Sequence, residues 1–163
     1  MNILSHGLWS GIAFGRAGRK EFFWAFFFGI APDLFSFGLF TGSVILGMAS
    51  GLDWSNGPPD PALVPQYVHS LYDVTHSFFV AAVVLGIVFA INKKIWLPLF
   101  AWPLHVLMDI PTHSTRFFPT PFLWPISEYR VNGVSWATPA IFYTDIVLLG
   151  MLYSFWFFKK RNR

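Results

Sequence analysis

The chain has no cysteine, and few of its 163 residues are charged. Without cysteine there is neither a disulfide framework nor a thiolate metal site, so any metal must be bound by histidine and carboxylate ligands. Only 12% of the residues are charged, whereas a soluble domain carries about 25%. With 55% hydrophobic residues and a mean hydropathy of +0.53, the composition predicts an integral membrane protein. The length allows one domain, which we expect to cover residues 1–163.

Motifs that would indicate other classes of protein are also missing. The N-terminus has neither a basic segment before its apolar run nor an Ala-x-Ala site, so we expect no cleavable signal peptide. There is no Gly-x-Ser-x-Gly sequence, the nucleophile elbow of many serine hydrolases. Lysine and arginine are few and lie at the ends of apolar runs. The pI of 9.4 therefore indicates membrane anchoring and not nucleic-acid binding.

Long apolar runs dominate what is present. A membrane-spanning helix needs about 20 apolar residues at a rise of about 1.5 Å each. The second and fifth runs are long enough, the third and fourth are marginal, and the first is short enough to be a half-span. We expect an all-α fold, an integral membrane bundle of about five helices. The runs are Ile3–Phe14, Phe22–Ala49, Thr75–Ile91, Ile95–Ile110 and Pro139–Phe158.

Basic residues form three clusters that share one side if all five runs cross the membrane. That side should be cytoplasmic, because short cytoplasmic loops carry an excess of lysine and arginine. The other side then receives the N-terminus, the loop from about Ser50 to Asp73 and the loop from Pro111 to Thr138. We expect a multi-pass membrane protein with a cytoplasmic C-terminus. The clusters are Arg16, Arg19 and Lys20, then Lys93 and Lys94, then Lys159, Lys160, Arg161 and Arg163.

Histidine and aspartate recur inside these apolar runs, where an unpaired polar group is expensive. His105 and Asp109 are four residues apart, so a helix places them on one face. His113 follows Pro111, where the helix should end and the chain can curl back. Pro32 can kink the second run and pull Asp33 toward the others. The set predicted to meet near the outer side is His6, Asp33, His76, His105, Asp109 and His113.

Each of these residues also has a purely structural interpretation. A single histidine on an apolar helix is more often a hydrogen-bonded core residue than a ligand, and Asp33 after Pro32 could cap a half-helix. Thr75 and Ser77 could form another cap. His69 lies in a predicted loop and is a weaker candidate ligand. The remaining assignments are Thr75, Thr112, Asp73 and Glu128 as supporting groups, and Asp53, Asp60 and Asp145 as solvated or structural carboxylates.

A histidine-rich set of nitrogen and oxygen ligands suits Zn²⁺ or another divalent transition metal better than Mg²⁺, which prefers oxygen. The candidates outnumber the four ligands of one tetrahedral ion, so two or three ions can be accommodated. Such ions lower the pKa of bound water toward about 7 and polarise a phosphoryl or acyl oxygen. The pattern therefore predicts a metal-dependent enzyme, with Asp33 and Asp109 as its catalytic carboxylates.

At these positions the chain resembles the bacterial family of membrane-bound, metal-dependent hydrolases. The shared features are a His-Gly pair, a Pro-Asp pair, a Thr-His-Ser motif and a His-x-x-x-Asp pair followed by Thr. Here they are His6-Gly7, Pro32-Asp33, Thr75-His76-Ser77, and His105 with Asp109 and Thr112. Residues 121–127, Pro-Phe-Leu-Trp-Pro-Ile-Ser, are similar to the family's Trp-Pro-Ser stretch.

One departure from the family concerns a ligand. Members often carry His-Arg-Gly before the Thr-His-Ser motif, where this chain has Leu71-Tyr72-Asp73. The number of metals therefore stays open, with Asp73 or His69 as replacements. The order of the candidate ligands is also remotely similar to that of zinc-dependent phospholipase C and related nucleases, which are helical enzymes with three zinc ions. This similarity implies His6, Asp33, His76, His105, Asp109 and His113 as the ligands and phosphoester hydrolysis as the reaction.

We therefore expect a membrane-embedded metal-dependent hydrolase in which a metal-activated water attacks a phosphoester. Arg116 or Arg130 would hold the phosphate through the planar guanidinium, although either could be an interfacial anchor instead. A site at the outer interface would meet a phospholipid-like headgroup, and the bilayer is the expected partner. The alternatives are an ion-binding or transport membrane protein, and a structural protein whose His–Asp pairs only join helices. No feature indicates the oligomeric state.

Overall fold

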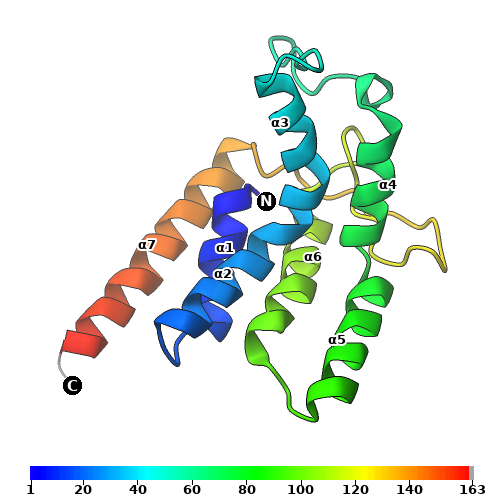
Figure 1. Ribbon diagram of the computed structural model, residues 1–163. Coiled ribbons are helices and arrows are strands. Elements are labelled where there is room, and N and C mark those ends of the chain that lie inside the picture. Colours follow the sequence, from blue (N-terminus) through cyan, green and yellow to red (C-terminus); the bar gives the residue numbers. More distant parts are fainter. Residues whose placement is uncertain (162–163) are drawn as a thin grey trace.

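The computed structural model describes residues 1–161, which form helices and loops and contain no strand (Figure 1). The all-α prediction is therefore confirmed for this part of the chain. The helices are α1 (Ile3–Phe14), α2 (Arg19–Asp33), the π-helical η1 (Leu34–Gly38), α3 (Leu39–Ile45), the 3₁₀ turn η2 (Pro61–Leu63), α4 (Gln66–Thr75), α5 (Phe78–Asn92), the 3₁₀ turn η3 (Leu97–Phe100), α6 (Ala101–Thr112) and α7 (Pro139–Arg161).

Two helices are long and apolar enough to cross a membrane, Arg19–Ile45 and Pro139–Lys159. They correspond to the second and fifth apolar runs, as predicted. A third span exists only if α4 and α5, which meet at a bend of 58°, count as one broken span. The predicted number of five membrane helices therefore stays a prediction.

Pro32 lies inside the long helix without ending it. The helix continues from α2 through the π-helical turn η1 into α3. A proline lacks the N–H that would bond the preceding turn, and a π-turn is one of the local adjustments associated with such a site. Ser36 in that turn donates to the Pro32 carbonyl at 2.9 Å. Asp33, at the junction, has 18% of its side chain exposed.

Helix α1 packs closely against α2 through glycines at every fourth position, Gly7, Gly11 and Gly15. A Cβ atom on Gly7 or Gly11 would lie within 3 Å of the rings of Phe26 and Phe22, respectively. Small residues at this spacing let helix backbones approach closely, which is a common way of joining helices in membranes. The pairing positions His6 on α1 beside the middle of α2.

The predicted loop from Ser50 to Asp73 is partly wrong, because Gln66–Thr75 forms helix α4. This helix buries Val68, Tyr72 and Thr75 and leaves Gln66 and Ser70 exposed. Its apolar residues recur at a helical spacing within a polar segment, so it lacks the continuous hydrophobicity by which membrane helices are recognised. The buried cluster against it includes Phe40, Val64 and Phe118.

Helix α6 ends where Pro111 predicted, with His113 as the residue that caps it. A strap from the 113–138 loop covers this end. The amides of Gly133, Val134 and Trp136 each donate at 2.9 Å to the carbonyls of His113, Pro111 and Thr112 in turn. A Cβ atom on Gly133 would lie 2.4 Å from the Pro111 carbonyl oxygen, so glycine permits the approach. The last carbonyls of α6 are thereby satisfied.

The turn between α1 and α2, the connection from α5 to α6 and the C-terminal end of α7 all lie at one end of the molecule (Figure 1). These segments carry the three basic clusters, apart from Arg163, which lies outside the described residues. Helices α3 and α4 and the loops joined to them lie toward the opposite end (Figure 1). The fold thus brings together the three segments that the charge pattern assigns to one side.

Candidate metal centre

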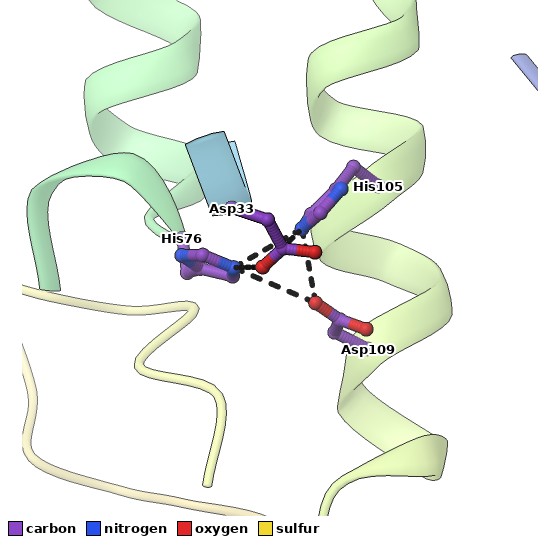
Figure 2. A group of neighbouring side chains, drawn as sticks. All are labelled: Asp33, His76, His105 and Asp109. Atoms are coloured by element: carbon purple, nitrogen blue, oxygen red, sulfur yellow. Dashed lines mark hydrogen bonds and ion pairs between the residues drawn. The ribbon is translucent and has the colours of Figure 1, made fainter. Parts of the chain in front are cut away.

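Four side chains from three parts of the chain point toward one another (Figure 2). They are Asp33 at the end of α2, His76 between α4 and α5, and His105 and Asp109 on α6. One ligand atom from each lies within 4.8 Å of all the others. Both histidines are fully buried, and Asp109 is 1% exposed. The structure therefore joins four of the six predicted ligands in a group that could hold a metal ion.

The protonation of the two histidines follows from their outer partners. Nδ1 of His105 lies 2.7 Å from the carbonyl oxygen of Gly29, and Nδ1 of His76 lies 3.1 Å from that of Tyr72. A carbonyl oxygen only accepts, so each Nδ1 must carry the proton and donate it. The Nε2 atom of each neutral ring then holds a lone pair. Metal-binding histidines are oriented in this way.

The two Nε2 atoms face each other at 3.1 Å. Oδ2 of Asp109 lies 3.0 Å from Nε2 of His105 and 3.5 Å from that of His76. Oδ1 of Asp33 lies 3.4 Å from the latter. Two imidazole nitrogens, each with its lone pair facing inward, thus meet two carboxylate oxygens. Oδ2 of Asp109 is buried and accepts no hydrogen bond. Acceptors at such distances repel one another unless a cation or proton lies between them, so the set fits a metal ion.

The other carboxylate oxygen of Asp109 contacts the two remaining predicted ligands. Nε2 of His6 lies 2.9 Å from Oδ1, and Nδ1 of His113 lies 3.2 Å from it. His6 is fully buried, stacks on the His105 ring at 3.7 Å between centroids, and has no partner for Nδ1. The Met1 amino group also donates to Oδ1. His6 and His113 therefore adjoin the four-residue group through Asp109.

The Thr-His-Ser motif places His76 by holding the chain on both sides of it. Oγ1 of Thr75 donates to the Leu71 carbonyl at 2.8 Å and lies 3.2 Å from the Pro32 carbonyl, next to Asp33. Ser77 caps α5, because its hydroxyl accepts from the Val80 amide at 3.2 Å. The structural interpretation of this motif and its role in a site are thus compatible.

The segment at 121–127 also holds the connection between α4 and α5, which carries His76. The Ser77 hydroxyl donates to the carbonyl of Trp124, and the amide of Phe78 donates to that of Phe122 at 3.0 Å. On the opposite side, Nε1 of Trp102 on α6 donates to the Thr75 carbonyl at 2.6 Å. The connection between α4 and α5, which carries His76, is therefore fixed to both α6 and the 113–138 loop.

The predicted supporting and phosphate-binding residues lie outside the four-residue group. Thr112 is buried, accepts from the Met1 amino group at 3.0 Å and donates to the Met108 carbonyl at 2.8 Å. Arg130 pairs with Asp73 at 3.5 Å and with the exposed Glu128 at 3.2 Å. Arg116 is exposed. The structure thus joins Asp73, Glu128 and Arg130 to one another rather than to the four-residue group.

The weaker candidates have local roles. His69 stacks on Phe118 and places Nε2 3.1 Å from the Pro61 carbonyl, away from the four-residue group. Asp145 is buried and accepts hydrogen bonds from Ser5 and from Nε1 of Trp9. These contacts agree with a structural interpretation of Asp145.

A cavity of about 800 Å³ opens beside the centre. Asp33, Tyr72 and His113 line it, together with one face of the helix from Leu34 to Ile45 and the loops opposite. Asp33 thereby links the buried group to a space that a small molecule can enter. Ligand-binding pockets typically have volumes of about 300–1,000 Å³, and this cavity lies within that range.

Two contributors were not predicted from the sequence. Tyr72 stacks on His76 at 3.8 Å between centroids and donates its hydroxyl to the Phe118 carbonyl at 3.0 Å. The carbonyl of Gly29 fixes the His105 ring. Tyr72 could have been found from its place four residues before His76 on a helix, had α4 been recognised. A backbone carbonyl has no signature in the sequence.

Comparison of the chain with models of protein families, with curated proteins and with solved structures finds no match.

Proposed function

We propose that the protein is a membrane-embedded, metal-dependent hydrolase that acts on a phosphoester. The observation that carries the proposal is the convergence of two imidazole lone pairs and two carboxylates beside a cavity. We also propose membership of the family of membrane-bound metal-dependent hydrolases, because the motif residues that suggest it are those found at the centre.

Asp33, His76, His105 and Asp109 would hold the first ion. Zn²⁺ is the metal proposed, because it binds both imidazole nitrogen and carboxylate oxygen. When bound, such an ion polarises a phosphoryl oxygen and makes water available as a nucleophile at neutral pH. His6 and His113, both against Oδ1 of Asp109, are the ligands proposed for any further ion.

The protein's own groups would orient the substrate and handle protons. Asp33 reaches the cavity and would face the reacting phosphoryl group. His113 also lines the cavity, has 16% of its side chain exposed, and is held through Nδ1 by Asp109. It is therefore the imidazole best placed to exchange a proton with a leaving group. The burial of His6, His76 and His105 keeps bulk water away from the ligands.

Arg130 is the arginine we propose for binding phosphate, because one of its guanidinium nitrogens, Nη1, is buried without a partner. Arg130 does not line the cavity, so its ion pairs with Asp73 and Glu128 would have to loosen and its side chain would have to move for it to do so. Arg116 remains a second candidate. We further propose that the protein lies in the bacterial inner membrane with the centre toward the outer face. The charge pattern of the loops supports this orientation.

The test measures metal content and hydrolysis together. Purified protein loaded with Zn²⁺ should contain bound metal and cleave a chromogenic phosphodiester. His105→Ala removes a proposed ligand and should lower both by at least about tenfold, because even outer partners of metal ligands contribute 10–100-fold to affinity. Elemental analysis and initial rates give the two readings.

The matched control is His69→Ala, which removes a histidine that lies outside the four-residue group. It should retain both metal and activity. Loss of metal in both variants would contradict the assignment of ligands. Metal binding that depends on His105, without hydrolysis of any phosphoester, would favour the ion-binding or transport alternative.

A further inference from the structure

The cavity beside the centre has two chemically different parts. The end at the centre carries Asp33, Tyr72 and His113. Away from it, the lining is mainly apolar and includes Leu34, Phe37, Ile45, Trp54, Phe117 and Trp136. A polar end that continues into an apolar channel has the shape of a site for an amphiphile.

The apolar part follows one face of a single helix. Leu34, Gly38, Thr41 and Ile45 line it at steps of three or four residues through η1 and α3, with Gly42 next to Thr41. From Leu34 to Ile45 the helix rises by about 17 Å, at about 1.5 Å per residue. This is long enough for an extended alkyl chain. The two glycines lower the wall of the groove.

The lack of basic side chains in the lining favours an amphiphile over phosphoesters that carry several negative charges. None of the residues that line the cavity is lysine or arginine, and the amino group of Met1, which also lines it, is already paired with Asp109 at the centre. A nucleotide or nucleic acid, with several phosphate charges along it, would meet no balancing cation along this wall. A ligand with one phosphoryl group at the centre and an uncharged chain leaves no charge unbalanced beyond the metal.

We propose that the cavity binds the alkyl chain of a lipid phosphoester, with the phosphoryl group at Asp33 and His113 and the chain along the face from Leu34 to Ile45. The inference rests on the proposed function for the position of the phosphoryl group. The apolar part of the groove would bind the alkyl chain whether or not the phosphoester is hydrolysed.

Gly42 provides the test, because a Cβ atom there would meet no atom within 4 Å. Gly42→Leu should therefore fill the groove without displacing a neighbour. The matched control is Gly86→Leu on α5, where a Cβ atom also meets nothing and which does not line the cavity. Both exchange a helical glycine for leucine, so their effects on helix propensity should be similar.

The experiment compares 4-nitrophenyl methyl phosphate with 4-nitrophenyl octyl phosphate, using Zn²⁺-loaded protein in lipid nanodiscs. Each buried methylene contributes up to a factor of about four, equivalent to about 0.8 kcal/mol. The wild type should prefer the octyl ester in kcat/KM by about 100-fold or more. Gly42→Leu should reduce this ratio at least tenfold, whereas Gly86→Leu should keep it. Equal ratios in all three proteins would overturn the proposal.

Binding of methylphosphonate and octylphosphonate is measured by calorimetry on the same samples. If no ester is hydrolysed, the proposed function fails, but the groove is still tested. Preference for octylphosphonate that is lost in Gly42→Leu and kept in Gly86→Leu would support the groove. Equal binding of the two phosphonates by the wild type would overturn it.

Discussion

At the scale of single residues, the centre depends on which nitrogen of each histidine faces inward. Carbonyl oxygens hold Nδ1 of His76 and of His105, so both Nε2 atoms point at Asp109. The sequence predicted the residue types and the shared face of His105 and Asp109. It could not predict the ring orientations, because the carbonyl that holds His105 comes from Gly29 on another helix.

Thr75 is the residue through which this orientation can be tested. Thr75→Val removes the hydroxyl that bonds the Leu71 carbonyl and lies beside Nδ1 of His76, while nearly keeping the shape of the side chain. We expect the affinity for Zn²⁺ to fall about tenfold, the lower end of the range for groups that orient a ligand. Competition with a chelating dye measures the affinity. Thr75→Ser, which retains the hydroxyl, should bind as the wild type does, and an equal loss in both variants would argue against this role.

At the scale of elements, the contact between α1 and α2 decides whether His6 and Gly29 lie near His105. A Cβ atom on Gly29 would lie 2.4 Å from Oγ of Ser10 and 2.7 Å from the His6 carbonyl. The two helices therefore touch almost backbone to backbone. The repeat of Gly7, Gly11 and Gly15 is visible in the sequence, but its partner helix is not.

Gly11→Leu should separate these helices, because a Cβ atom there would lie 2.4 Å from the Phe22 ring. Overpacking typically costs about 1–3 kcal/mol, so the midpoint of thermal unfolding should fall by several degrees. The amount of Zn²⁺ bound by the protein should fall as well, because the Gly29 carbonyl on α2 holds the His105 ring. Gly150→Leu on α7, where a Cβ atom meets nothing within 4 Å, is the control and should leave the midpoint nearly unchanged. Circular dichroism of the protein in detergent follows the transition.

At the scale of the whole molecule, the arrangement of the chain ends and loops bears on membrane orientation. The segments with the basic clusters lie at one end (Figure 1), while the loop that contains Ser55 lies between α3 and α4. If the positive-inside rule applies, that loop faces the outside. The absence of cysteine makes single-cysteine variants a clean probe of this orientation.

Ser55→Cys places a thiol in the loop between α3 and α4, and Asn92→Cys places one at the end of the molecule that carries the basic clusters. Both positions are exposed. In intact spheroplasts a membrane-impermeant maleimide should label Ser55→Cys. Asn92→Cys, which precedes Lys93 and Lys94, should react only after the membrane is permeabilised. The reverse pattern of labelling would invert the proposed topology, and labelling of both in intact spheroplasts would contradict a spanning arrangement.

What the sequence determined by itself is the class of the protein: all-helical in the described part of the chain, with two helices apolar enough to span a membrane and with polar residues suited to a cation. These properties follow from local composition and spacing, because the cost of burying a polar group and the period of a helix act along the chain. The tertiary structure decided which of the residues predicted to meet form one group, namely Asp33, His76, His105 and Asp109. It also decided that α4 is a helix and that an apolar groove continues from Asp33. Those features depend on close contacts between distant segments, such as the contact of α1 with α2 and that of the 113–138 loop with α6.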